Sequence, residues 1–214
     1  MAKKADNSNN KKTKRILFES MELIMKNLKE NMENIDRNFK YTQKFIDLLF
    51  DGIKNKRRFF LLASGRSGMI LQCFQTRLVH LGARVYFISN KDSIPALRDK
   101  DVLIVLSGSG TTEIVVGMLN SYLNKLKPHS VVSITSHPET IIGRVGDVTI
   151  KLKGRSKRDK TPEDEMASDT AILTPEGTAF EQVAFTYLDA IIAELAIRLG
   201  KSNEDMLKKH SDAT

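Results

Sequence analysis

The chain has 214 residues, of which 41% are hydrophobic and 28% charged, and its formal net charge is +8. This composition predicts a globular protein with room for one ordinary domain rather than a disordered chain. No apolar run approaches the roughly 18–20 residues that span a membrane, and no apolar signal core stands near the N-terminus, so we expect a cytoplasmic protein without a membrane partner.

The positive charge is concentrated in two short segments. Residues 1–15 hold six Lys or Arg against one acid, and residues 151–160 hold six against one. Neither segment has interleaved aromatic residues that could stack on bases, which disfavours a nucleic-acid partner. The first segment is polar and has no apolar pattern, so we expect a disordered basic tail over 1–15 and a single domain over 16–214. The one cysteine, Cys73, lies in an apolar helical pattern and is predicted to be a buried structural thiol.

The order of predicted elements indicates the fold class. Apolar residues recur at helical spacing from Ile16 to about Phe50, with a break near Asn38 that predicts two helices or one bent helix. The predicted strands are Phe59–Ala63, Arg84–Ile88, Val102–Leu106, Ser130–Thr135 and Val148–Leu152. The predicted helices are Ser67–Leu81, Thr112–Leu126, Ile141–Val145, Ala179–Leu199 and about Asn203–His210, with a polar loop over 154–175 that would suit a lid. This alternation predicts an α/β fold, a doubly wound five-stranded parallel sheet flanked by helices.

Two segments rich in Gly and Ser follow predicted strands and precede predicted helices. The first is Ser64–Gly68, and the second, here called the serine loop, is Ser107–Thr112. Glycines let the backbone approach an anion closely, hydroxyls donate to its oxygens, and a helix N-terminus adds N–H groups. If the first and third strands are neighbours, both segments meet at the carboxyl edge of the sheet. The candidate phosphate ligands are then Ser67, Ser107, Ser109 and Thr112, unless these residues merely cap helices.

Neither segment has a nucleotide-binding fingerprint. The first offers one Gly-x-x-Gly, from Gly65 to Gly68, without the leading Gly-x of a dinucleotide site. The serine loop has Gly108-x-Gly110 but no third glycine and no Lys followed by Ser or Thr, so it is not a P-loop. A small phosphorylated metabolite therefore fits these segments better than a dinucleotide.

Read together, the two segments resemble the sugar isomerase (SIS) domain family, which binds phosphosugars with such a pair of loops. Within it, the chain is most similar to the 6-phospho-3-hexuloisomerases. The stretches that carry this narrower resemblance are Arg66 in its loop, Arg77–Gly82, Gly154–Lys157, Pro175–Glu181 and Met206–His210. The chain departs from the family at Ser89–Pro95, Thr111 and Glu176, which leaves the exact sugar open.

The resemblance implies an isomerase that interconverts 3-hexulose 6-phosphate and fructose 6-phosphate through a cis-enediol, in the ribulose monophosphate pathway. It implies a phosphorylated ketohexose as substrate, no cofactor and no metal, and a homo-oligomer, dimer or tetramer, with a homotetramer as the family form. Glu181 would be the catalytic base and His210 a second catalytic residue able to reach a neighbouring subunit. The implied phosphate-binding residues are Ser64, Gly65, Arg66, Ser67, Ser107, Ser109 and Thr112.

Other readings of these residues stay open. On position alone, Glu181 is a first-turn acid favoured by the helix dipole, and His210 belongs to a solvated terminus. A related isomerase of the arabinose 5-phosphate type would fit the same loops, although such relatives usually carry Lys where Arg66 stands. A non-catalytic phosphosugar-binding regulator would also fit, because function does not follow from fold, but it would have no use for Glu181.

Overall fold

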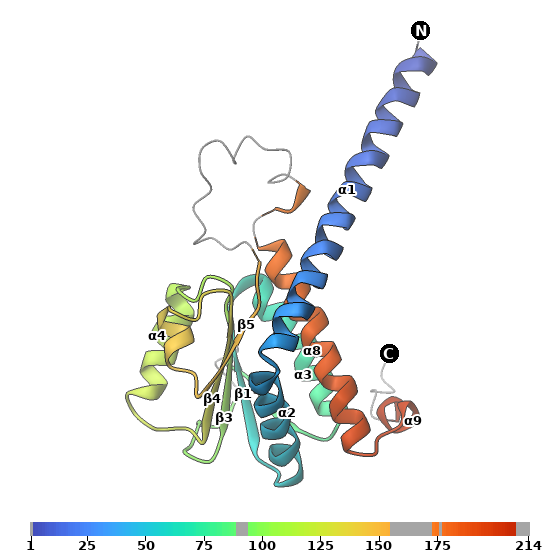
Figure 1. Ribbon diagram of the computed structural model, residues 1–214. Coiled ribbons are helices and arrows are strands. Elements are labelled where there is room, and N and C mark those ends of the chain that lie inside the picture. Colours follow the sequence, from blue (N-terminus) through green and yellow to red (C-terminus); the bar gives the residue numbers. More distant parts are fainter. Residues whose placement is uncertain (1, 89–93, 155–172, 176, 209–214) are drawn as a thin grey trace.

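The computed structural model describes residues 2–88, 94–154, 173–175 and 177–208 (Figure 1). Its helices are α1 (Ala2–Arg37), α2 (Phe39–Lys54), α3 (Gly65–His80), α4 (Glu113–Leu123), α5 (Ile141–Arg144), α8 (Thr178–Arg198) and α9 (Asn203–Leu207). Its strands are β1 (Arg58–Leu62), β2 (Arg84–Phe87), β3 (Val102–Leu106), β4 (Ser130–Thr135) and β5 (Val148–Lys151). The five strands form one parallel sheet in the order β2-β1-β3-β4-β5. The predicted α/β fold with a five-stranded parallel sheet is confirmed.

The sheet is buried on both faces, and its central strand, β3, is apolar at every position. Alternate residues of β1 point to opposite faces: Phe59 and Leu61 belong to one core cluster, and Phe60 and Leu62 to the other. The first cluster is completed by α2, α3 and α8, and the second by α4 and α5, as the layers of Figure 1 show. Two cores of this kind fix the register of the sheet, and with it the position of the loops at the strand ends.

The N-terminal region is helical throughout. The break expected near Asn38 is confirmed, because α1 ends at Arg37 and α2 begins at Phe39. In place of the disordered tail predicted for 1–15, the structure continues α1 back to Ala2. Residues 2–15 contain no Pro or Gly, so nothing in their sequence stops a helix that the apolar pattern starts further along. The side chain of Asn31 holds α1 to the body by donating to Lys153 O at 2.9 Å and accepting from Lys153 N–H at 2.7 Å.

One burial prediction is wrong. Cys73 is exposed, not a buried structural thiol. The buried hydrophobic side chains of α3 are Leu71, Phe74 and Leu78, which follow one another at three- and four-residue spacing. Cys73 lies between them along the chain and on the solvent side of the helix.

Candidate active site

The two Gly- and Ser-rich segments meet because their strands are neighbours. In the sheet, β1 pairs directly with β3, and Leu62 lies opposite Val105 at the carboxyl ends. The strand order reverses direction between these two strands, so α3 and α4 leave toward opposite faces and a crevice opens between them. The condition under which the sequence predicts one shared site is therefore met.

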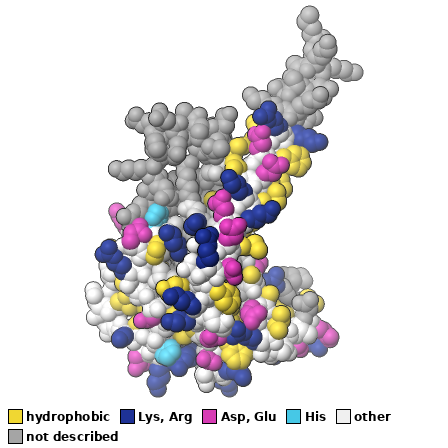
Figure 2. Space-filling model, in the orientation of Figure 1, with side chains coloured by type: hydrophobic (Ala, Val, Ile, Leu, Met, Phe, Trp, Pro, Cys, Tyr) yellow, Lys and Arg dark blue, Asp and Glu magenta, His cyan; other side chains and the backbone are white. Residues whose placement is uncertain are grey.

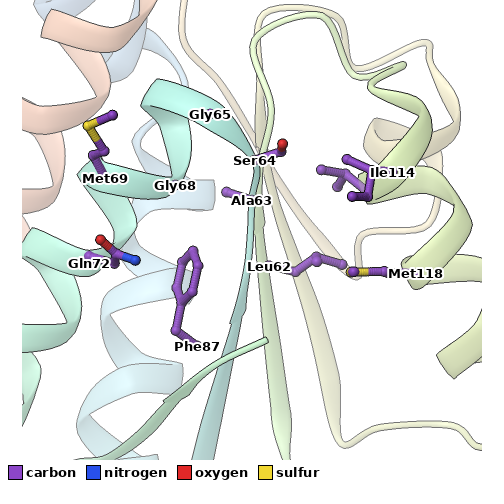
Figure 3. Close-up of a pocket in the computed structure, with 11 residues that line it drawn as sticks. Leu62, Ala63, Ser64, Gly65, Gly68, Met69, Gln72, Phe87, Ile114 and Met118 are labelled. Carbon is purple, nitrogen blue, oxygen red and sulfur yellow. The ribbon is translucent and has the colours of Figure 1, made fainter. Parts of the chain in front are cut away.

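A pocket of about 240 Å³ lies in this crevice (Figure 3). Ser64 and Gly65 line it from the first segment, Phe87 from the end of β2, and Ile114 and Met118 from α4. Gly65 has a positive φ of 58°, which lets the chain turn sharply from β1 into α3. Ser67 lies in the first turn of α3 and is half-buried. The hydroxyls of the serine loop are not part of this lining, so the pocket marks the first-segment half of the crevice.

The serine loop gathers three hydroxyl groups. Thr112 Oγ1 lies 3.2 Å from Ser107 Oγ and 3.4 Å from Ser109 Oγ. The loop also folds on its own backbone, since Gly110 N–H donates to Ser107 Oγ and Thr111 N–H to Ser109 Oγ. Thr112 is the N-cap residue of α4, so the cluster stands at the N-terminus of an 11-residue helix. Hydroxyl donors and helix N–H groups in one place are suited to a phosphate group.

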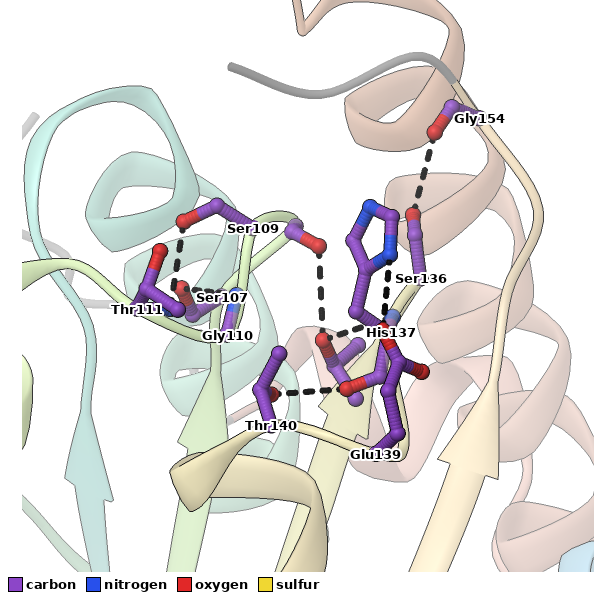
Figure 4. A network of polar contacts seen from close by, with 11 residues as sticks. Ser107, Ser109, Gly110, Thr111, Ser136, His137, Glu139, Thr140 and Gly154 are labelled. Atoms are coloured by element: carbon purple, nitrogen blue, oxygen red, sulfur yellow. Dashed lines mark hydrogen bonds and ion pairs between the residues drawn. The ribbon is translucent and has the colours of Figure 1, made fainter. Parts of the chain in front are cut away.

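Residues 135–140, which are the last residue of β4 and the loop that follows it, hold the serine loop in place (Figure 4). Thr135 Oγ1 and Ser136 N–H both donate to Gly108 O, at 3.3 and 3.2 Å. Thr140 Oγ1 donates to His137 O at 2.7 Å and stands so close to Gly110 that a Cβ on residue 110 would overlap it. These threonines carry no motif in the sequence that marks them as site residues. The signal that could have found them is their place directly after the strand next to β3.

The N-terminus of α8 packs against the serine loop through Phe180. Its side chain is 1% exposed, and a Cβ on Gly108 would lie 2.9 Å from Phe180 Cδ1. On the other side, Gly154 lies against the Phe180 backbone so closely that no side chain would fit. Ser136 Oγ donates to Gly154 O at 3.1 Å and closes this ring of contacts (Figure 4). The next residue, Glu181, follows this anchored phenylalanine in the first turn of α8.

Glu181 forms an ion pair with Arg66 of the first segment. Arg66 Nε lies 2.8 Å from Glu181 Oε2, and the Glu181 side chain is only 12% exposed against 53% for Arg66. Arg66 Nη1 also reaches Thr178 Oγ1 at 3.5 Å. Gly177, the N-cap residue of α8, has a φ of 85°, and a Cβ there would lie 3.2 Å from Glu181 Oε1. A carboxylate with little exposure to water thus stands beside Arg66 of the first segment.

Three expectations remain: the role of His210 and the 154–175 loop, the absence of a metal, and the absence of a membrane partner. His210 lies outside the described residues, as do Arg155 and Lys157 and most of the 154–175 loop. Within the described part of the chain, no three His, Cys, Asp or Glu side chains gather in a way that could hold a metal ion. No described helix is long and apolar enough to cross a membrane.

Comparison with known families decides what kind of domain carries this arrangement. The profile of the SIS domain matches residues 52–186, which include β1 to β5, both segments and Glu181. The chain belongs to the SIS domain family. The match begins within α2 and ends within α8, so most of the N-terminal helical region lies before it.

Relatives of this SIS protein cover most of its length. An uncharacterized protein of Archaeoglobus fulgidus is 32% identical over 185 residues, which are 84% of this chain and 96% of the relative. The 3-hexulose-6-phosphate isomerase of Methanocaldococcus jannaschii is 29% identical over 190 residues, 85% of this chain and 96% of that enzyme. A solved structure from Methanococcus jannaschii, reported to infer the molecular function of a 3-hexulose-6-phosphate isomerase, is 28% identical with a TM-score of 0.72. It covers 92% of this chain and 99% of its own.

Proposed function

We propose that this SIS protein is a phosphosugar isomerase that interconverts 3-hexulose 6-phosphate and fructose 6-phosphate. The observation that carries the proposal is the position of Glu181, a carboxylate 12% exposed that directly follows Phe180, whose ring packs on Gly108 of the serine loop. A base next to a phosphate site is what an isomerase of phosphorylated ketoses needs. The names of the relatives at 28–29% identity support the same sugar.

The reaction needs one base that acts on two neighbouring carbons. Glu181 takes the proton from C2 of the 3-ketose, and the C–H electron pair becomes the C2=C3 double bond of a cis-enediol while O3 gains a proton. The same carboxylic acid then returns its proton to C3, the O2 hydroxyl loses its proton, and a carbonyl forms at C2. The Arg66 guanidinium, 2.8 Å from Glu181 Oε2, favours the charged carboxylate that can accept this proton.

The phosphate would bind at the serine loop. Ser107, Ser109 and Thr112 supply hydroxyl donors, and the N-terminus of α4 supplies backbone N–H groups and the positive end of its dipole. Ser64, Gly65 and Ser67 of the first segment, which the family resemblance implies as further phosphate ligands, would bind next to these hydroxyls, and Ser64 and Gly65 line the pocket. His210 stays a proposal from the family resemblance, as a proton donor to the sugar oxygens that acts within or between subunits.

We further propose that the protein assembles as a dimer or tetramer through its N-terminal helices. Phe18, Met25, Met32 and Phe39 recur every seven residues, and each side chain is about half exposed or more. Figure 2 shows hydrophobic side chains between charged ones along this helical region. Beside them, α1, α2 and α8 form a groove of about 690 Å³. We also propose that the protein works in the cytoplasm, as an enzyme of the ribulose monophosphate pathway.

A coupled assay tests the function. The purified protein is supplied with 3-hexulose 6-phosphate, and the release of fructose 6-phosphate is followed with a dehydrogenase-linked readout. Parallel reactions with arabinose 5-phosphate and ribulose 5-phosphate test the related isomerase. Turnover of the pentose phosphates alone would replace the hexulose assignment, and binding of all these sugars without turnover would make the protein a phosphosugar-binding regulator.

A further inference from the structure

The side chain of Arg66 bridges two helices that are far apart in the sequence. It leaves the first turn of α3 and makes both of its contacts on the first turn of α8, through Nε to Glu181 Oε2 and through Nη1 to Thr178 Oγ1. Neither contact is with the serine loop, where the phosphate is proposed to bind. Arg66 is therefore placed at the reacting end of the site rather than at the phosphate end.

We propose that Arg66 is a positioning residue for Glu181, which holds its carboxylate in one orientation and in the charged form that accepts a proton. This inference rests on the proposed function, in which Glu181 is the base. It removes Arg66 from the set of phosphate ligands that the family resemblance implies. In this proposal the first segment both lines the pocket and orients the carboxylate of Glu181.

Burial and geometry together explain why the base needs such a partner. The Glu181 side chain is 12% exposed, and burial disfavours a charged carboxylate unless an opposite charge lies close. The guanidinium at 2.8 Å supplies that charge and remains cationic at any pH at which the protein is folded. The carboxylate also lies close to Gly177, where a Cβ would stand 3.2 Å from Glu181 Oε1. The carboxylate is thus held near both a planar cation and a stretch of backbone without a side chain.

Lysine should replace Arg66 only in part. An ammonium group carries the same charge, but it lacks the planar fork that reaches two oxygens on one helix turn, here Glu181 Oε2 and Thr178 Oγ1. The proposal therefore separates charge from geometry. Arg66→Gln removes both, Arg66→Lys keeps the charge, and Thr178→Val removes only the second contact. Arg144→Gln, at an exposed residue of α5, is the matched control for loss of a surface charge.

The kinetic test compares kcat with KM. For Arg66→Gln we expect kcat to fall by about tenfold to a hundredfold, since a misplaced base loses that much, with KM for 3-hexulose 6-phosphate changed by less than about threefold. The acid limb of kcat/KM should move to higher pH by about one unit or more. Arg66→Lys should keep the wild-type acid limb with an intermediate kcat, Thr178→Val should lower kcat alone, and Arg144→Gln should match the wild type. A KM raised tenfold with kcat and acid limb unchanged would overturn the proposal in favour of a phosphate ligand.

A second measurement does not depend on turnover. In protein labelled with ¹³C-glutamate, the Glu181 carboxyl resonance is assigned by its loss in Glu181→Gln and titrated in each variant. The titration midpoint should rise in Arg66→Gln and stay in place in Arg66→Lys and Arg144→Gln. A midpoint that does not move in Arg66→Gln would overturn the positioning role. A wild type that titrates as expected but isomerises no sugar phosphate would overturn only the proposed function.

Discussion

Phe180 packs directly on Gly108 and joins the helix that carries the proposed base to the loop that carries the proposed phosphate site. The contact is close enough that a Cβ on residue 108 would lie 2.9 Å from Phe180 Cδ1, inside van der Waals distance. Phe180 is 1% exposed and belongs to the larger of the two cores, so its ring has little room to yield. A core contact therefore joins the first turn of α8, which carries Glu181, to the serine loop.

Gly108→Ala should lower activity far more than its single methyl suggests. The added Cβ forces the serine loop and α8 apart, and a displacement of a few tenths of an ångström to 1 Å at the base costs about tenfold to a hundredfold in kcat. Overpacking of this kind also lowers the free energy of unfolding by about 1–3 kcal/mol. Steady-state kinetics and urea unfolding measure the two effects.

Gly117→Ala is the control for Gly108→Ala. Gly117 lies within α4, and a Cβ there meets nothing within 4 Å. This variant should keep its activity and gain about 0.5–1 kcal/mol in the free energy of unfolding, because Ala is the better helix former. Equal activity of the two variants would show that the contact between Phe180 and Gly108 does not set the site geometry.

Glu181→Gln should abolish isomerisation while phosphosugar binding persists. The amide keeps the size of the carboxylate but cannot take a proton from carbon. The value of kcat should therefore fall by about a hundredfold to ten-thousandfold. Binding of fructose 6-phosphate, measured by calorimetry, should change little. Glu33→Gln on the exposed face of α1 is the matched control. Turnover at the wild-type rate in Glu181→Gln would remove this residue as the base.

Ser109→Ala combined with Thr112→Ala should weaken phosphosugar binding. Each hydroxyl is expected to donate to a charged phosphate oxygen, and such hydrogen bonds contribute about 1.5–3 kcal/mol each, so the loss of both should raise KM by about a hundredfold or more. Ser121→Ala on the outer side of α4 should leave KM unchanged. An unaffected KM in the double variant would mean that the phosphate binds away from the serine loop.

The fold was predictable because its strands are visible in the sequence as short local runs of apolar residues. Val102–Leu106 is apolar at every position and is buried at every position, as a central parallel strand must be. The break near Asn38 was equally visible in the spacing of apolar residues. The helical structure of residues 2–15 was not, since a polar segment without Pro or Gly carries no local signal that distinguishes a helix extension from a tail.

The site was predictable only in part, because its decisive contacts join residues far apart in the chain. The serine loop is one continuous segment whose residue types indicate its chemistry. The pairing of Arg66 with Glu181 spans more than one hundred residues and depends on how α8 packs against α3, which no periodicity encodes. Thr135 and Thr140 were missed for the same reason, since they act on Gly108 and Gly110 of another loop.

Tyr187 should make the protein sensitive to alkaline pH. Burial raises the pKa of its phenol, whose hydroxyl donates to Thr42 Oγ1 at 3.2 Å. Below about pH 10 the phenol is protonated in both the folded and unfolded states. Above that pH only the unfolded state ionises, so the free energy of unfolding should fall by up to about 1.4 kcal/mol per pH unit until the folded-state pKa is reached.

Urea unfolding at pH 7, 9.5 and 11 measures this alkaline loss. Tyr187→Phe should be less stable than the wild type at pH 7 by about 0.5–1.5 kcal/mol, because the hydrogen bond to Thr42 is lost, but its stability should fall less steeply above pH 10. Tyr41→Phe, at an exposed position of α2, should follow the wild-type curve. Parallel losses in the wild type and in Tyr187→Phe would assign the alkaline sensitivity to other groups.

The exposed stripe of Phe18, Met25, Met32 and Phe39 on the N-terminal helices should be the self-association face. Met32 is 69% exposed and Phe39 48% exposed, and both line the groove between α1, α2 and α8. In a dimer, the stripe of one copy can pack into the groove of the other copy, and the reverse contact forms at the same time. In a two-fold interface every substitution occurs twice, so Met32→Glu together with Phe39→Glu would place four charges in it. Fully burying a Met or Phe side chain contributes about 1.5–3 kcal/mol, and a buried unpaired charge reverses that gain.

Sedimentation velocity and light scattering over a range of protein concentrations test this face. The wild type should have the mass of a dimer or tetramer, and the double variant should have a lower mass while it keeps the helical signal of the fold. Lys29→Glu reverses a charge at an exposed polar position of the same helix and should leave the mass unchanged. A wild type that is monomeric at every concentration, or a double variant with the wild-type mass, would contradict the assignment. If the site needs His210 from a neighbouring subunit, the double variant should also lose activity in proportion to its monomer fraction.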